Sequence, residues 1–501
     1  MPGPTPRPAP ESGGADMPDR LDTEVVVVGA GPVGLLLAGE LRLGGARVTV
    51  LERRTGPLAE SRASTLHART MEILDSRGLL AGIPDPPGER RGHYAGIPLD
   101  LTLPGSRPGL WKVPQQETER LLGHWAAALG ADIRRGHTVR AVTATEEYAE
   151  AEAVGVHGTV RVRGAFLVAC DGEDSTVREL TGAAFPGHDA RRELLRADVA
   201  GIDVPDRRFE RLPDGLAIAA RRADGVTRVM VHEHGTPAPH RTGAPAFDEI
   251  VRAWKRVTGE DIGGGTPLWV NAFGDTSRRL THYRHGRILF AGDAAHRQLP
   301  IGGQALNLGL QDAFNLGWKL AAEVTGRAHP ALLDSYHDER HPVGQRVLTS
   351  IEAQALLLLG GPEADPTRTL LTELLTHEPV RAHLAATLTG LDPRYDVHGP
   401  PHPLTGARLP DTPLTASPSG ATTSTEALRP GRGLLLGPGT LPEAAAILGG
   451  RTVPFATPAP APDLTGWTLV RPDGHVVWAA PSPDGLQDAL TRWFGPGTSH
   501  H

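Results

Sequence analysis

Apolar and polar positions near the N-terminus follow a strand–helix–strand pattern. Residues 25–28 are four consecutive valines, a continuous β-branched run of the kind found in buried parallel strands. Residues 35–43 carry leucines at helical spacing, and residues 48–51 form a second apolar run that ends at Glu52. A glycine-rich segment joins the first run to the helical one. The pattern therefore predicts a strand, a tight turn, a helix and a second strand.

The glycines of that turn have the spacing of a dinucleotide-binding unit. Gly29 would make the turn, Gly31 would let the backbone approach a pyrophosphate, and Gly34 would let helix and strand pack closely. The free N–H groups and positive dipole end of the helix suit phosphates. Glu52 lies where an acid accepts hydrogen bonds from an adenosine ribose. An ordinary α/β turn would explain the glycines alone, but not the strand, helix, second strand and terminal acid together.

Two later apolar runs also end in acids. Residues 166–170 are followed by Asp171 and a glycine, and residues 287–291 are followed by a glycine and Asp293. Because the carboxyl ends of parallel strands meet at one edge of a sheet, we expect both acids near the same ligand. Asp-Gly is also a common turn, so the first pair is weak evidence on its own.

Further helices are predicted around the nucleotide unit. An amphipathic pattern predicts a helix near residues 71–74, and the proline and acids in residues 113–122 predict the start of another. A long helix from about residue 300 to 324 would present its N-terminus to the ligand edge. His296 lies just before that helix. A histidine there is more often a structural hydrogen-bonding residue than a catalytic one.

The pattern changes between residues 186 and 279. Residues 215–220 and 227–232 alternate as strands around an Ala-Asp-Gly turn, which predicts an antiparallel hairpin, and residues 268–273 predict another strand. An antiparallel sheet inserted between two halves of a nucleotide-binding domain suggests a substrate cover.

Composition predicts a less structured segment at each side of the folded units. Residues 1–20 are rich in proline and glycine and predict a disordered tail, and residues 400–430 are rich in proline, threonine, serine and glycine and predict a linker. Residues 431–501 combine apolar runs with a helical pattern and predict a small α/β domain.

Charge and cysteine content exclude several functions. The formal net charge of −7 argues against nucleic acid as the main partner. Cys170 is the only cysteine, which excludes an intramolecular disulfide and a cysteine-built metal site, and we predict no metal. No apolar run is long enough to cross a bilayer, and no signal peptide is evident, so we expect a cytoplasmic protein without a membrane partner.

Several motifs together resemble the class A flavoprotein monooxygenases, whose best-known member is para-hydroxybenzoate hydroxylase. The three fingerprints are Gly29-Ala30-Gly31-Pro32-Val33-Gly34, Asp171-Gly172 and Gly292-Asp293. The closer likeness is to aromatic polyketide hydroxylases and rifampicin monooxygenase. It is carried by Leu41-Arg42-Leu43, His67-Ala68-Arg69-Thr70, Ala95-Gly96-Ile97-Pro98-Leu99-Asp100 and Asn307-Leu308-Gly309-Leu310-Gln311-Asp312-Ala313-Phe314-Asn315-Leu316-Gly317-Trp318-Lys319.

The resemblance implies an α/β fold with a Rossmann-like FAD-binding domain, an inserted antiparallel-sheet substrate domain and a C-terminal thioredoxin-like domain. The FAD-binding domain would comprise residues 21–185 and 280–399, the substrate domain residues 186–279, and the thioredoxin-like domain residues 431–501. A thioredoxin needs a dithiol for exchange, and this tail has no cysteine, so we expect it to be a structural appendage.

The resemblance also implies specific residues for the cofactor FAD. Glu52 and Arg53 would hold the adenosine end, Val139 would touch the adenine, and Asp293 would bind the ribityl chain. Asp171 would support both FAD and the passing NADPH or NADH. The full set of implied cofactor-binding residues is Gly29, Gly31, Val33, Gly34, Glu52, Arg53, Arg62, Gln115, Val139, Asp171, Asp293, Pro300, Gly302, Gly303, Leu306 and Asn307.

Two features depart from the family pattern. Members commonly have glycine where Ala305 stands, and the segment Arg297-Gln298-Leu299 is atypical. Both border the expected flavin and substrate, so they bear on how a substrate is oriented.

The main functional hypothesis is hydroxylation of a polycyclic aromatic polyketide with NAD(P)H and O₂ through a flavin C4a-hydroperoxide, in antibiotic biosynthesis. Baeyer–Villiger oxygen insertion is an alternative, and so is a flavoprotein that binds an aromatic ligand without turnover. Trp269 and Phe273 are candidates for substrate contact. Arg62 is the one suspected catalytic residue, since its cation could support a moving flavin; a surface arginine is the alternative. We expect a monomer or a homodimer.

Overall fold

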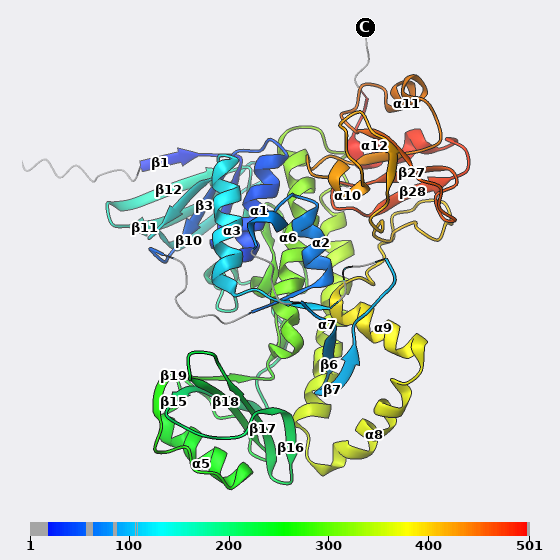
Figure 1. Cartoon of the computed structure of the whole chain (residues 1–501). Coiled ribbons are helices and arrows are strands. Elements are labelled where there is room, and N and C mark those ends of the chain that lie inside the picture. Colours follow the sequence, from blue (N-terminus) through cyan, green and yellow to red (C-terminus); the bar gives the residue numbers. More distant parts are fainter. Residues whose placement is uncertain (1–18, 57–63, 84–87, 106, 108, 498–501) are drawn as a thin grey trace, which may run out of the picture.

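The computed structural model describes residues 19–56, 64–83, 88–105, 107 and 109–497. Two sheets and three helices form its central unit (Figure 1). The six-stranded sheet has the order β21 (Arg284–His285), β22 (Ile288–Phe290), β13 (Phe166–Ala169), β2 (Val25–Val28), β3 (Val48–Glu52) and β9 (Asp132–Arg135). Its strands pair in parallel except β21, which is antiparallel to β22.

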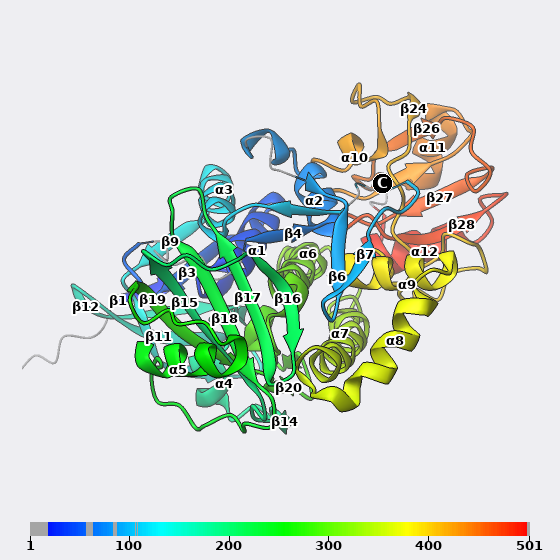
Figure 2. The same cartoon turned by 60° about the horizontal axis from the view of Figure 1, so that its bottom comes forward.

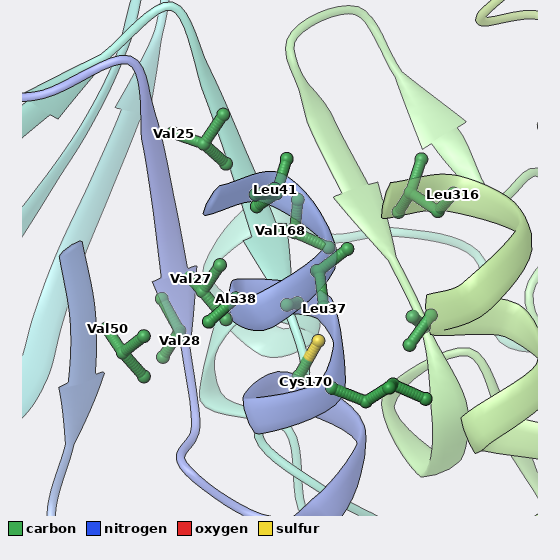
Figure 3. Close-up of a cluster of buried hydrophobic side chains, with 14 of the residues drawn as sticks. Val25, Val27, Val28, Leu37, Ala38, Leu41, Val50, Val168, Cys170 and Leu316 are labelled. Atoms are coloured by element: carbon green, nitrogen blue, oxygen red, sulfur yellow. The ribbon is translucent and has the colours of Figure 1, made fainter. Parts of the chain in front are cut away.

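Burial explains why these strands form here. All four valines of β2 are at most 5% exposed, as expected for a parallel strand covered on both faces. Helices α1 (Pro32–Leu43), α3 (Gln115–Ala128) and α6 (Gln304–Val324) pack beside one another, and their apolar side chains join those of the sheet in one core. Figure 3 shows part of this core, with Leu37 and Leu41 of α1 beside Val168, and Leu316 on the neighbouring helix α6. The predicted strand, turn, helix and second strand are confirmed.

A second sheet contributes to the same core. Its order is β1 (Asp19–Asp22), β12 (Gly158–Gly164), β11 (Ala149–Gly155) and β10 (Thr138–Ala144). Buried alanines and valines of β11 and β12 pack with the six-stranded sheet. Asp19 and Arg20, which we expected in a disordered tail, begin β1; residues 1–18 of that predicted tail lie outside the described residues.

The predicted antiparallel sheet lies at the foot of the molecule in Figure 1. Its order is β16 (Arg207–Leu212), β17 (Gly215–Arg221), β18 (Thr227–Glu233), β15 (Glu193–Ala200) and β19 (Thr266–Gly274), all antiparallel. Helix α5 (Phe247–Thr258) packs against one face through Ile250, Trp254 and Val257. The other face turns toward the central unit, and its apolar residues share a cluster with Leu299 and Ile301.

Shorter elements connect these units. The small strands are β4 (Thr65–His67), β5 (Gly88–Glu89), β8 (Leu110–Lys112), β6 (Arg91–Tyr94), β7 (Ile97–Asp100), β14 (Gly187–His188), β20 (Ser277–Arg279) and β23 (His296–Arg297). The connecting helices are α2 (Ala68–Asp75), α4 (Thr176–Thr181), α7 (Ser335–Leu359), α8 (Asp365–Leu374), α9 (Glu378–Thr389) and the 3₁₀ turns η1 (Leu80–Gly82), η2 (Gly292–Ala294), η3 (Ile301–Gly303) and η4 (Pro362–Ala364). Figure 2 shows α7 between the antiparallel sheet of β15–β19 and helices α8 and α9.

The C-terminal unit is a second α/β body. Its sheet has the order β24 (Leu414–Ala416), β26 (Phe455–Pro458), β25 (Leu434–Leu436), β27 (Trp467–Val470) and β28 (Val476–Ala480). Its helices are α10 (Ser424–Ala427), α11 (Leu441–Leu448) and α12 (Leu486–Phe494). Because β24 pairs with β26, the expected linker over residues 400–430 is instead partly folded into this sheet. The α/β class is confirmed.

Candidate functional site

The turn after β2 has the geometry of a phosphate cradle. Gly29 has φ +103°, and a Cβ there would lie 2.4 Å from the carbonyl oxygen of Cys170, so only glycine fits. A Cβ on Gly31 would meet nothing within 4 Å, which leaves its backbone open to a ligand. A Cβ on Gly34 would lie 2.0 Å from the Gly29 carbonyl oxygen. No side chain caps α1, so its first N–H groups face that opening.

Glu52 closes this turn from the end of β3. Its Oε2 accepts a hydrogen bond from the Ala30 N–H at 2.8 Å, and its Oε1 accepts one from the Arg54 N–H at 2.8 Å. The side chain is thereby fixed at the sheet edge. Arg53 is exposed beside it, and Val139 is buried on β10. Their contacts with an adenosine stay predictions.

Asp171 has a structural task that the sequence did not reveal. Its Oδ1 accepts a hydrogen bond from Ser175 Oγ at 2.6 Å, and its Oδ2 accepts one from the Val177 N–H at 3.1 Å, so it fixes the start of α4. Burial raises the pKa of Asp171 and these hydrogen bonds oppose that shift. Gln115, the first residue of α3, donates from Nε2 to Glu119 Oε1 at 2.9 Å. Arg62 lies outside the described residues.

The second glycine-aspartate motif, Gly292-Asp293, lies on η2, and Asp312 fixes its position through hydrogen bonds. Oδ2 of Asp312 accepts hydrogen bonds from the Gly292 N–H at 3.2 Å and from Nε2 of His296 at 2.8 Å. Its Oδ1 accepts one from Nε of Arg340 at 2.7 Å. Burial alone would raise the pKa of Asp312, but Arg340 and His296 together hold it below its ordinary value. His296 is therefore a buried structural partner, in line with the interpretation that we favoured.

Asp293 differs from Asp312 because its carboxylate accepts no hydrogen bond from the residues that the structure describes. It is half-buried. Burial raises its pKa. Val33 at the start of α1 lies against Gly292, where an added Cβ would be 3.1 Å from Val33 Cγ2, so the two motifs are adjacent. An unused carboxylate beside the phosphate cradle suits a hydroxyl-rich ligand.

The long helix begins at a second open N-terminus. Gly302 and Gly303 have φ of +64° and +71°, and no side chain caps α6. Pro300, just before them, is exposed, and Leu306 is half-buried. His67 binds the Gly302 carbonyl through Nε2 at 2.9 Å, and burial lowers its pKa to about 4, so the ring is neutral.

Asn307 fastens the first turn of α6 to its surroundings. Its Oδ1 accepts hydrogen bonds from the His67 N–H at 2.8 Å and from Thr70 Oγ1 at 2.7 Å. Its Nδ2 donates to the carbonyl oxygens of Thr65 at 3.0 Å and Gly303 at 2.8 Å. With all its side-chain hydrogen bonds made inside the protein, Asn307 can offer a ligand only its backbone.

Trp269 and Phe273 share one face of β19. The Arg196 guanidinium lies 4.4 Å from the Trp269 ring centroid and 5.2 Å from that of Phe273. Phe273 also packs in the apolar cluster that includes Leu299 and Ile301. The structure therefore brings Phe273 to the loop before α6. Arg196 was missed from the sequence, because a charged residue within a strand gives no sign of which face it occupies.

A buried charge network joins the C-terminal unit to the central one. Arg471 donates to Glu339 at 2.5 Å, and Lys319 Nζ donates to the same carboxylate at 2.8 Å. Arg69 Nη2 donates to the Asp473 carbonyl oxygen at 2.7 Å.

A cavity of about 20 Å³ behind the first turn of α6 has room for water only.

Two other kinds of site are absent from the described ranges. No group of three or more histidine, cysteine, aspartate or glutamate side chains there could hold a metal ion. No helix in the same part of the chain is long and apolar enough to span a membrane.

Comparison with known families identifies the ligand of this site. Residues 22–350 match the family described as FAD binding domain, and residues 402–497 match that described as aromatic-ring hydroxylase, C-terminal. The chain is 42% identical to a 12-dehydrotetracycline 5-monooxygenase/anhydrotetracycline 6-monooxygenase of Streptomyces rimosus, over 94% of this chain and 99% of that protein. The chain belongs to the class A FAD-dependent monooxygenases.

Other relatives are also similar to this chain over nearly its full length. Rifampicin monooxygenase of Streptomyces venezuelae is 40% identical over 95% of this chain and 99% of its own. The crystal structure of CabE, an aromatic hydroxylase from angucycline biosynthesis, is 46% identical with a TM-score of 0.91 and covers 95% of this chain and 100% of CabE. A dialkyldecalin synthase of Streptomyces rugosporus is also 40% identical, over 94% of this chain and 99% of its own.

The residues present fit the FAD expected of a class A monooxygenase. The open backbone at Gly31 suits the pyrophosphate, the free carboxylate of Asp293 suits ribityl hydroxyls, and the uncapped start of α6 suits the electron-rich edge of the flavin. The three features come from segments far apart in the sequence.

Proposed function

We propose that the protein hydroxylates a polycyclic aromatic polyketide with FAD, NAD(P)H and O₂, in the biosynthesis of an antibiotic. The observation that carries the proposal is the pair of uncapped helix N-termini, of α1 and α6, together with an Asp293 carboxylate that has no hydrogen-bond partner among the described residues. The relatives named as monooxygenases of tetracycline intermediates and rifampicin support the substrate class. When bound, FAD would take a hydride from NAD(P)H and activate O₂.

The chain's own residues would bind, orient and shield. In this proposal Gly29, Gly31 and the first turn of α1 hold the pyrophosphate, Glu52 holds the ribose, and Asp293 holds the ribityl chain. The N–H groups of Leu306 and Asn307, at the positive end of α6, stabilise negative charge on the flavin ring. Trp269 and Phe273 would cover the substrate and exclude water. No protein nucleophile is needed.

Arg62 and the C-terminal unit have supporting parts in the proposal. Arg62 would assist flavin movement between reduction and oxygenation, and its substitution by alanine should slow flavin reduction by NADPH while FAD still binds. Flavin reduction at the wild-type rate in stopped-flow measurements would mean that Arg62 is a surface arginine without this role.

The C-terminal unit would be a thioredoxin-like fold used for packing, since it lacks cysteine.

The decisive experiment measures oxygen transfer. Purified protein with FAD is given NADPH, ¹⁸O₂ and a panel of polycyclic phenols, and products are analysed by mass spectrometry. Substrate-stimulated NADPH oxidation with one labelled oxygen in a phenolic product supports hydroxylation. A labelled ring ester, identified by NMR, would instead establish Baeyer–Villiger insertion.

A second candidate has one specific observation behind it. The dialkyldecalin synthase is as similar to this chain as rifampicin monooxygenase, and its name describes no oxygenation. A flavoprotein that binds an aromatic ligand without oxygenating it is therefore compatible with this scaffold. Tight ligand binding without NADPH oxidation across the panel would favour it.

A further inference from the structure

A buried carboxamide without a partner lies between β23 and η3. Gln298 is 9% exposed, and neither its Nε2 nor its Oε1 has a hydrogen-bond partner in the part of the chain that the structure describes. Another buried glutamine, Gln354, has partners. Gln354 donates to Gln304 Oε1 at 3.1 Å and accepts from the Ala95 N–H at 3.3 Å. Burying a donor and an acceptor together without partners is unfavourable, so Gln298 implies a group that supplies both.

The position of Gln298 limits what that group is. Two residues earlier, His296 is fixed by Asp312 at 2.8 Å behind the glycine-aspartate motif. One residue later, Leu299 packs in the apolar cluster that contains Leu194 and Phe273 of the antiparallel sheet. The carboxamide thus lies on the segment that runs from the proposed flavin site to the face proposed to cover the substrate.

We propose that Gln298 determines substrate specificity by reading an oxygen pattern on the aromatic ring system. Its Oε1 accepts a hydrogen bond from a phenol hydroxyl, and its Nε2 donates one to a carbonyl oxygen. The assignment rests on the proposed function. The flavin is a less suitable occupant, because its pyrimidine edge already has the backbone N–H groups of Leu306 and Asn307. A neutral carboxamide suits a hydroxylated quinone or ketone, which has both a donor and an acceptor.

Binding of two matched probes tests this assignment. The FAD-loaded enzyme is titrated with 2,6-dihydroxyanthraquinone and with anthraquinone, which lacks the hydroxyls, and binding is followed through the flavin absorbance. Gln298→Leu has nearly the same volume without hydrogen-bonding groups. It should weaken binding of the dihydroxy probe about tenfold or more, since a phenol hydroxyl and a carbonyl oxygen both lose their partner. Anthraquinone loses only the partner of a carbonyl oxygen, so its binding should weaken less and the ratio of the two affinities should fall.

The melting temperature separates a binding role of Gln298 from a structural one, because loss of a structural hydrogen bond would lower the Tm. Removing two unpartnered polar atoms should leave the Tm of the FAD-loaded Gln298→Leu variant unchanged or higher. Gln354→Leu is the matched control: it deprives Gln304 and the Ala95 N–H of their partner, so its Tm should fall, while the ratio of the two probe affinities stays at the wild-type value.

Two results would overturn the assignment. A lower Tm for Gln298→Leu with an unchanged affinity ratio would mean that the carboxamide serves the fold, through an internal water. A weaker FAD affinity with an unchanged probe ratio would assign it to the flavin. A wild-type enzyme that binds both probes but never oxidises NADPH would count against the proposed function alone, because probe selectivity is measured without turnover.

Discussion

Asp312 accepts hydrogen bonds from three different parts of the chain, namely the Gly292 N–H, the His296 ring and the Arg340 guanidinium, while remaining fully buried. The cofactor motif at Gly292 is therefore set by a residue that never faces the cofactor. The sequence did not reveal this. Arg340 and Asp312 are 28 residues apart on different helices, and their pairing depends on how α6 and α7 pack rather than on any local pattern.

Replacing Asp312 should unfold the protein readily. Asp312→Ala leaves the Arg340 charge buried and uncompensated, so the free energy of unfolding should fall by about 3–5 kcal/mol in denaturant titrations. Asp22→Ala removes an exposed ion pair with Arg20 and should cost less than about 1 kcal/mol. Equal losses in the two variants would contradict this account.

Asp293 should act on the cofactor instead of the fold. Asp293→Ala removes a charge-assisted hydrogen bond to the ribityl chain, a loss of about 1.5–3 kcal/mol or roughly tenfold or more in FAD affinity. Fluorescence titration of the apoprotein measures it, with the exposed Asp484→Ala as control. Unchanged FAD affinity would remove Asp293 from the site.

At the scale of the elements, those that depend on residues close together in the sequence were predicted. The valine run, the glycine turn and α1 depend on neighbours in the chain, and so do the hairpin of β17 and β18 and the start of α6. The segment over residues 400–430 was misjudged for the opposite reason. Its proline-rich composition is that of a linker, whereas β24 forms only because it pairs with β26, more than 30 residues later.

The loop before α6 should respond to acid. His67 is neutral in the fold with a pKa of about 4, below its ordinary 6.5, because of burial. A lowered histidine pKa stabilises the fold fully above about pH 6.5, and that stability is lost as the pH falls toward about 4. FAD release should therefore increase across this window. His67→Gln keeps a donor to the Gly302 carbonyl without titrating, so it should flatten the release curve. The remaining slope would include the histidines whose pKa values are also about 4, namely His93, His341 and His475.

At the scale of the whole molecule, the charged contact between the central and C-terminal units should dominate their joint stability. Arg471→Ala leaves the buried Glu339 with Lys319 and the Asn315 amide and takes the arginine from the buried Asp473, so it should lower the free energy of unfolding by about 3–5 kcal/mol. Arg492→Ala on the exposed side of α12 should change it little. Removal of residues beyond about 430 should reduce stability and solubility before it alters the chemistry. A well-folded truncated protein with slowed flavin reduction would contradict this order.

The same contact has a defined pH range. Burial would raise the pKa of Glu339, but the charges of Arg471 and Lys319 outweigh burial and lower it from the ordinary 4.5 to about 2. A lowered carboxyl pKa contributes stability that is complete above about pH 4.5 and is lost as the pH falls toward about 2. Thermal melts of wild type and Glu339→Gln should differ most above this range and converge below it.

The first turn of helix α2 is bonded to two parts of the protein that are far apart in sequence. Thr70 Oγ1 donates to Asn307 Oδ1, and Arg69 Nη2 donates to the Asp473 carbonyl oxygen at the turn after β27. For protein engineering this makes the C-terminal unit a poor interchangeable module. The tail supplies Arg471 and Asp473, and the central unit supplies Glu339 and Lys319. A chimera that exchanges tails between relatives should fold only if the incoming tail keeps the first pair and the host keeps the second. Recombination breakpoints that separate the two pairs should therefore be under-represented among functional hybrids.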